Sequence, residues 1–93
     1  MSRPTWFVYL IRTRNNTLYT GITTNVERRF AEHCAGKGAK YLKGRGPLSL
    51  VFQAAVTNRS AALKAEHAIK KLSRAEKLRL LNDANWLYEN IMD

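Results

Sequence analysis

Chemistry in this chain could be carried by five residues whose side chains exchange protons, pair with anions or bind metal ions: Tyr9, Tyr19, Arg29, His33 and Glu66. Hydroxyl and imidazole groups can transfer a proton, a guanidinium pairs with anionic oxygens, and a carboxylate can bind a divalent cation. Each also has an ordinary structural explanation, because strand tyrosines usually pack, a lone histidine is usually structural, and glutamate favours helices. Whether these five residues form a functional site therefore depends on the helices and strands that position them.

A basic segment lies between Cys34 and Leu50 and holds four cations without an acidic residue: Lys37, Lys40, Lys43 and Arg45. The whole chain has 16 Lys and Arg against 7 Asp and Glu, a net charge of +9. Such a cluster is the usual footprint of a surface that binds a polyanion, although a merely solvated basic face has the same composition. An anionic membrane is the weaker alternative, because no amphipathic helix flanks the cluster.

The length of 93 residues predicts a single domain with room for one core and one shallow site. The one cysteine, Cys34, excludes an intrachain disulfide framework and a cysteine-based zinc site. No apolar run approaches the roughly 18 residues of a membrane span, and the first residues lack the pattern of a secretory signal. We therefore expect a soluble, basic protein of the cytoplasm.

Two strands are predicted near the N-terminus. Residues 6–11 form an unbroken apolar run, which is typical of a central strand buried on both faces. Residues 17–22 predict a second strand, and the polar segment between them, with its two asparagines, predicts a hairpin turn. A turn centred on Arg14 would place Tyr9 directly opposite Tyr19, with both side chains on one face of the sheet.

A helix is predicted over residues 26–35, between an asparagine cap and a glycine stop. Its apolar sector includes His33, and Arg29 emerges on the flank of that sector. Arg28 points the other way, where we expect an exposed i, i+4 ion pair with Glu32. The two adjacent arginines are therefore predicted to differ, and only Arg29 lies beside the core.

The second half of the chain predicts one more strand and three helices. Residues 36–47 form a connection with a short helical turn, and residues 48–56 predict a third strand. A helix that opens at Ser60 carries Glu66 at the border of its alanine-rich face, where the carboxylate looks into the domain. Further helices are expected from the capping box at residues 73–76 and over residues 86–92, the last one packing its aromatic side chains on the body.

The tripeptides at residues 7–9 and 19–21 resemble the paired motifs that name the GIY-YIG nuclease superfamily. Here they are Phe-Val-Tyr and Tyr-Thr-Gly, so both tyrosines and the second glycine are kept, and the replaced positions are expected to be strand packing. As in that family, an arginine follows the motif glycine by eight residues and a histidine follows four later, and Glu66 is placed like the metal-binding glutamate on the later helix. Residues 36–47 and 69–77 are similar to a small stand-alone bacterial subgroup known as UPF0213 or YhbQ-like.

The resemblance implies an α+β fold, in which a small three-stranded antiparallel sheet is flanked by helices. It implies one domain over residues 1–93, with a core at about residues 5–81 and a C-terminal helical extension over residues 82–93. It also implies hydrolysis of phosphodiester bonds with one divalent metal ion, Mg²⁺ or Mn²⁺, and water as the nucleophile. A bacterial cytoplasmic location is the matching expectation.

The resemblance also implies a role for each candidate. Arg29 would bind the non-bridging phosphate oxygens, and Glu66 would hold the metal ion. Tyr19 is the candidate to deprotonate or orient the water, with Tyr9 assisting through hydrogen bonds. Because a tyrosine pKa is ordinarily near ~10, a base role requires Arg29 or the metal ion to lower it. His33 would be a second positioning group or an alternative base.

In this interpretation the basic segment binds the backbone phosphates of DNA without regard to sequence, and Tyr41 either stacks on an exposed base or packs the loop. Single-stranded, duplex and branched DNA are all compatible, in repair, recombination or DNA uptake. We expect no membrane partner, and the oligomeric state stays open, with a monomer compatible.

Two alternatives to a DNA endonuclease remain. One is a non-catalytic module that binds DNA or RNA on the same scaffold, and the other is an RNA-associated or protein-interaction factor. Metal-dependent cleavage separates an enzyme from the module. Tight RNA binding that is independent of Mg²⁺ would favour the second alternative.

Overall fold

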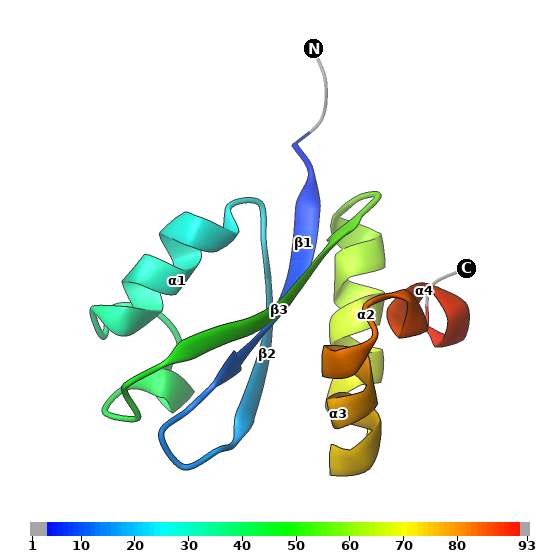
Figure 1. The fold of residues 1–93 in the computed structure, drawn as a ribbon. Helices are drawn as coiled ribbons and strands as arrows, with labels where there is room; N and C mark the ends of the chain where they lie inside the picture. The colour runs from blue at the N-terminus through cyan, green and yellow to red at the C-terminus, as the bar shows by residue number, and fades with distance from the viewer. Residues whose placement is uncertain (1–3, 92–93) are drawn as a thin grey trace.

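The computed structural model describes residues 4–91 and has a three-stranded antiparallel sheet between helices. The strands, in the spatial order β2-β1-β3, are β1 (Trp6–Arg12), β2 (Leu18–Thr23) and β3 (Ser49–Val56). Figure 1 shows α1 (Val26–Cys34) on one side of the sheet and, on the other, α2 (Arg59–Lys70), α3 (Arg74–Asn82) and α4 (Asn85–Asn90). A short 3-10 helix, η1 (Lys40–Leu42), lies between α1 and β3. The expected α+β fold is confirmed.

The central strand β1 is buried on both faces, as its unbroken apolar sequence predicts. Val8 and Leu10 point into a core that they share with α2, α3 and α4. Tyr9 and Ile11 point to the opposite face, into a second cluster with side chains from α1 and η1. A catalytic candidate on this strand is therefore held by core packing and not by a loop.

The β1–β2 hairpin differs by two residues from the predicted register. Tyr9 pairs with Gly21, and not with Tyr19 as a turn centred on Arg14 would require. The turn is centred one residue later, on Asn15. Asn16 takes a left-handed backbone conformation there, with φ at 67°, which suits the three-residue loops of hairpins. Since side chains alternate with a period of two, the shift leaves both tyrosines on the same face.

Side-chain caps set the helix boundaries. The predicted caps at Asn25 and Ser73 are both present, the second as a full capping box. Helix α2 begins at Arg59 instead of Ser60, because the Asn58 side chain caps it by accepting a backbone N–H. Asparagine is as good an N-cap as serine, so the earlier of the two residues starts the helix.

Helix α4 is anchored in the main core by Leu87, which is 0% exposed. The expectation that aromatic residues pack this helix on the body is confirmed for Trp86. It is wrong for Tyr88, whose side chain is exposed and whose hydroxyl donates to the Ala55 carbonyl on β3 at 2.8 Å. The predicted end of this helix at Met92 lies outside the described residues.

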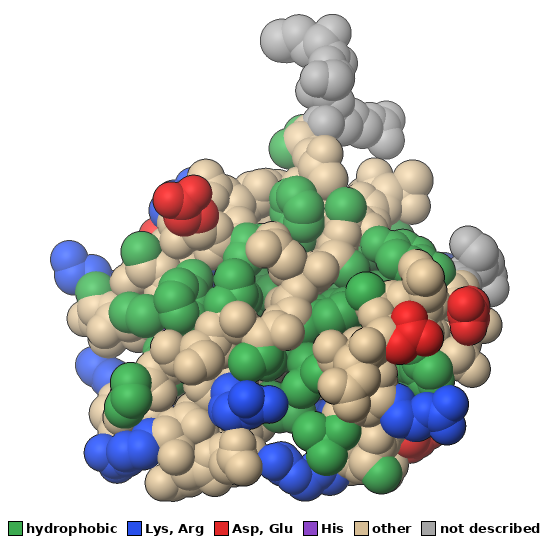
Figure 2. All heavy atoms as spheres, viewed as in Figure 1, with side chains coloured by type: hydrophobic (Ala, Val, Ile, Leu, Met, Phe, Trp, Pro, Cys, Tyr) green, Lys and Arg blue, Asp and Glu red, His purple; other side chains and the backbone are tan. Residues whose placement is uncertain are grey.

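Charge is unevenly spread over the surface. In the view of Figure 2 most Lys and Arg side chains lie in the lower half, where Figure 1 places the β1–β2 turn, the segment before β3 and the junction of α2 with α3. Over residues 4–91, none of the helices has both the length and the apolar character that crossing a bilayer requires. The segments that carry most of these cations are those that border the candidate site described below.

Leu87→Ala should lower the free energy of unfolding by about 2–5 kcal/mol, because it removes a fully buried side chain from the core. Leu78→Ala is the matched control, since Leu78 is already 38% exposed and should cost less than about 1 kcal/mol. Urea denaturation followed by circular dichroism measures both. Equal effects would show that α4 does not contribute to the core.

Candidate active site

Tyr9 from β1 and His33 from α1 meet in the interior between the strand and the helix. They are 1% and 2% exposed, and Tyr9 Oη lies 2.8 Å from His33 Nε2. The sequence presents them as separate candidates, 24 residues apart. The fold joins them into one hydrogen-bonded pair.

The hydrogen bonds of His33 fix its tautomer. The Ala39 N–H donates to Nδ1 at 3.1 Å, so the neutral ring carries its proton on Nε2 and donates it to Tyr9 Oη. The tyrosine proton is thereby left for another acceptor. Burial lowers the pKa of His33, and the charge of Arg29 lowers it further. With both ring nitrogens engaged, the geometry favours a positioning role over a base role for His33.

Two glycines leave the space that this pair occupies. A Cβ atom at Gly21 would lie 2.5 Å from Tyr9 Oη, because the tyrosine ring lies across its strand partner. A Cβ atom at Gly38 would collide with Nδ1 of His33. The glycine of the second tripeptide therefore has a steric explanation. Gly38 has the same function in the loop, and sequence reasoning missed it because only the tertiary contact reveals it.

Tyr19 extends the pair into an aromatic cluster on the edge strand β2. Its ring centroid lies 6.5 Å from that of Tyr9 and 5.6 Å from that of His33, edge-on to the imidazole. Tyr41 of η1 stacks on Tyr19 with 6.0 Å between centroids and an interplanar angle of 20°. The cluster thus leads from a buried histidine to an exposed tyrosine.

Burial raises the pKa of both strand tyrosines. For Tyr9 the pKa is about 12, since burial and the nearby Tyr19 outweigh the lowering effect of Arg29. For Tyr19 burial raises the pKa, Arg29 opposes it, and the negative charge of Glu66 adds to it. Both side chains are therefore neutral hydroxyls at neutral pH. One cation and one carboxylate lie close enough to act on both.

Arg29 is the cation at the centre of the cluster, as predicted. Its charge acts on both strand tyrosines and on His33, and its Nη1 donates to Glu32 Oε1 at 3.0 Å. The predicted ion pair between Arg28 and Glu32 is therefore wrong. A spacing of three residues also brings side chains together on a helix, and the partly buried position of Arg29 makes it the better partner. Arg28 is exposed.

Glu66 faces the cluster from α2, as its border position predicts. Its side chain is only 19% exposed and forms an ion pair with Lys70, with 3.6 Å between Oε2 and Nζ. Its charge raises the pKa of both Tyr9 and Tyr19. Two charges of opposite sign, from α1 and α2, therefore act on the same pair of hydroxyls.

The donor set suits a hard divalent cation. Among residues 4–91 no group of three or more His, Cys, Asp and Glu side chains is arranged to hold a metal ion, so Glu66 is the candidate carboxylate ligand. Mg²⁺ keeps most of its water ligands and commonly takes one or two carboxylates. A site with one glutamate therefore fits Mg²⁺ or Mn²⁺.

The basic segment is partly engaged within the protein. Its three lysines are exposed, whereas the Arg45 guanidinium lies over the Tyr41 ring, 4.4 Å from the centroid. The Tyr41 hydroxyl also donates to Thr17 Oγ1 at 3.1 Å. Tyr41 thus packs the loop, and the residue is still 44% exposed.

A depression of about 330 Å³, called here the β2 groove, adjoins Tyr19 and is lined by Leu18, Tyr19, Thr20, Tyr41, Lys70 and Lys77. Sequence reasoning missed both lysines. Lys70 follows Glu66 by four residues, a spacing that places the two on one helix face. Lys77 belongs to the next helix, so only the tertiary structure brings it here.

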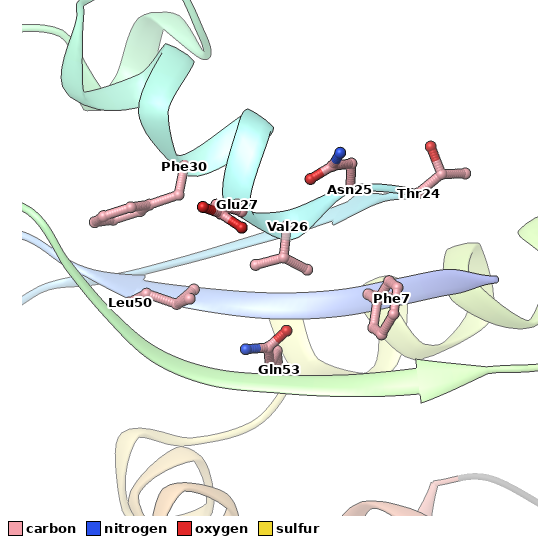
Figure 3. A pocket seen from close by; sticks show the side chains of 8 residues that line it. All are labelled: Phe7, Thr24, Asn25, Val26, Glu27, Phe30, Leu50 and Gln53. Carbon is pink, nitrogen blue, oxygen red and sulfur yellow. The ribbon is translucent and has the colours of Figure 1, made fainter. Parts of the chain in front are cut away.

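A different hollow of about 500 Å³ lies between α1 and the sheet. Figure 3 shows Val26 and Phe30 of α1 above Phe7, Leu50 and Gln53 of the strands. It is lined by none of the predicted catalytic residues. Because catalytic sites gather titratable groups with perturbed pKa values, we place the chemistry at the tyrosine cluster instead.

The neutral state of buried His33 should make stability depend on pH. The folded protein lowers the pKa of His33, whereas unfolded histidine titrates near ~6.5, so the unfolded state binds more protons between the two values. The free energy of unfolding should therefore be fully developed above pH ~6.5 and fall as the pH drops below it. Urea denaturation at several pH values measures this slope.

His33→Gln should remove that part of the pH dependence, and His67→Ala, at an exposed position, should retain it. An unchanged slope in His33→Gln would contradict the neutral, hydrogen-bonded histidine.

Comparison with known proteins identifies the family. The model of the GIY-YIG catalytic domain matches residues 5–79. The UPF0213 protein YhbQ of Escherichia coli (strain K12) is 59% identical over 76 residues, which cover 82% of this chain and 76% of that protein. The solution NMR structure of UPF0213 protein BH0048 from Bacillus halodurans is 41% identical, with a TM-score of 0.56 over 84% of this chain and 83% of that one.

A second solution NMR structure, of protein EF2693 from E. faecalis, is 37% identical, with a TM-score of 0.61 over 87% of this chain and 86% of that one. The span that matches the family model contains the whole tyrosine cluster with Arg29 and Glu66. The chain therefore belongs to the GIY-YIG nuclease superfamily and, within it, to the UPF0213 group of small bacterial proteins.

Proposed function

We propose that this protein is a metal-dependent DNA endonuclease that hydrolyses phosphodiester bonds with low sequence specificity. The observation that carries the proposal is that the buried Tyr9–His33 pair and Tyr19 form one cluster, on whose hydroxyls the charges of both Arg29 and Glu66 act. A phosphate placed there meets a guanidinium, two hydroxyls and a carboxylate suited to a divalent cation. These are the groups that stabilise the charge developing on phosphate oxygens during hydrolysis.

Arg29 is proposed to bind the non-bridging oxygens of the scissile phosphate. Its planar fork of N–H donors matches phosphate geometry, and its partly exposed side chain can reach a ligand. Binding requires the guanidinium to leave Glu32 for the phosphate, which replaces one anion by another. The divalent cation, held by Glu66, supplies charge stabilisation to the leaving oxygen when it is bound.

The tyrosines are proposed to position the attacking water as neutral hydroxyls. Tyr9 Oη accepts the proton of His33 Nε2, so its own O–H is directed to another acceptor, such as a phosphate oxygen or the water. Tyr19, less buried than Tyr9, is the candidate to orient the water. Its raised pKa means that a base role would require bound cation charge to favour the phenolate.

The substrate class follows from the charge around the site. Exposed lysines of the basic segment and the net charge of +9 supply attraction to a phosphate backbone that weakens as salt rises. Backbone contacts of this kind position a nucleic acid without reading its sequence. Single-stranded, duplex and branched DNA all present the backbone that this surface would bind.

Arg29→Ala should reduce cleavage by about 10²-fold or more, because one charged donor to the transition state is lost, and should weaken DNA binding only modestly. Arg28→Ala is the matched control at the adjacent exposed position and should retain activity. Cleavage of end-labelled DNA under single-turnover conditions measures both. Equal losses in the two variants would contradict the assignment of Arg29 to the site.

Wild-type protein should cleave DNA with Mg²⁺ or Mn²⁺ and not with EDTA, and Glu66→Ala should lose at least about 10²-fold of this activity, since metal charge stabilisation is worth several kcal/mol. Glu27→Ala, which removes an exposed carboxylate from α1, should behave as the wild type. Circular dichroism checks that both variants fold.

Full activity in Glu66→Ala would remove Glu66 from the site. Salt-sensitive DNA binding by the wild type without any cleavage would favour the non-catalytic nucleic-acid-binding module.

A further inference from the structure

The β2 groove has the size and position of a nucleotide subsite. Its volume of about 330 Å³ falls at the lower end of the range for small-ligand sites, roughly 300–1,000 Å³. Tyr19 lines both this groove and the tyrosine cluster. A group bound in the groove is therefore a direct neighbour of the phosphate proposed to react.

Two helices contribute the cations of the groove. Lys70 is the last residue of α2 and Lys77 lies in α3, so the turn between the helices brings two ammonium groups to one depression. Lys77 is half-buried, so part of its side chain lies against the protein. Among residues 4–91 no carboxylate forms an ion pair with Lys77. The groove thus offers an incoming anion a positive charge that has no carboxylate partner among the described residues.

The state of Lys70 depends on Glu66. Their ion pair, with 3.6 Å between Nζ and Oε2, joins a lysine side chain that is 57% exposed to a glutamate side chain that is 19% exposed. A phosphate can exchange with this carboxylate at the exposed side chain of Lys70, and a cation bound to Glu66 would then neutralise the released carboxylate. Metal binding and phosphate binding are in this way compatible on one helix face.

Tyr41 supplies the apolar part of the groove. The residue is 44% exposed, and its ring is fixed in place by Tyr19, by Arg45 and by the hydrogen bond to Thr17. A preorganised aromatic ring beside cations is the arrangement that binds bases and backbone of a single strand.

We propose that the β2 groove binds the nucleotide next to the cleaved bond in a single-stranded segment of DNA, with its phosphate on Lys70 and Lys77 and its base beside Tyr41. This inference rests on the proposed function and adds a subsite to it. A groove of about 330 Å³ lined by an edge strand, two tyrosines and two lysines suits one nucleotide of a single strand, so we expect it to favour single-stranded over duplex DNA.

The test is the salt dependence of binding to fluorescein-labelled oligo(dT), measured by fluorescence anisotropy in EDTA so that no cleavage occurs. The double variant Lys70→Ala/Lys77→Ala should bind more weakly. The slope of log K against log salt concentration should shrink by about 0.7, because the two lysines share one phosphate and each phosphate contact of a single strand contributes roughly 0.7. Lys70→Arg/Lys77→Arg should restore both values.

The matched control is Lys64→Ala/Lys71→Ala, which removes the same charge from exposed positions that line a separate depression on α2. This variant should keep the wild-type slope. Equal losses in the two alanine variants, or tighter binding to duplex than to oligo(dT) in the wild type, would overturn the subsite. Absence of any DNA binding by the wild type would overturn the proposed function itself, and the two failures are therefore distinguishable.

Discussion

The buried hydrogen bond between Tyr9 and His33 is the constraint on which the site depends. It spans 2.8 Å between the central strand and α1 and is possible only because Gly21 and Gly38 carry no Cβ atoms. Once the ring is fixed by the Ala39 N–H, α1 is held in one rotation against the sheet. Arg29, one helical turn before His33, then lies beside the tyrosines, with part of its side chain still open to solvent.

Burial and the charge of Arg29 change the pKa of the two tyrosines in opposite directions, and burial has the larger effect. Arg29 favours the ionised form of each tyrosine, yet desolvation keeps the pKa of Tyr9 at about 12 and also raises that of Tyr19. In a partly buried site, a neutral hydroxyl beside a guanidinium is a better preorganised dipole than a phenolate, which the guanidinium would bind too tightly to release. The site thus keeps its positive charge for an anionic ligand.

The sequence predicts those features that depend on local pattern. The two-sided burial of β1, the caps of α1 and α3, and the placement of Arg29 and Glu66 beside the core all follow from periodicity and capping chemistry. The hairpin register does not, because one left-handed residue, Asn16, decides it. Three further features cannot be predicted from local pattern: the ion-pair partner of Glu32, the steric requirement for glycine at Gly38 and the position of Lys77. Each depends on contacts made only in the folded chain.

Both cations that flank the tyrosines carry an internal counter-ion, Glu32 for Arg29 and Glu66 for Lys70. Ligand binding at such a site is an exchange reaction, in which one ion pair is broken for each one formed. The net gain in binding free energy is the difference between the energies of the ion pair formed and the ion pair broken. The affinity therefore stays moderate although the site contains many charges. In the proposed reaction, the resident carboxylates would compete with the cleaved product for the same cations, which would speed product release and favour turnover over tight retention.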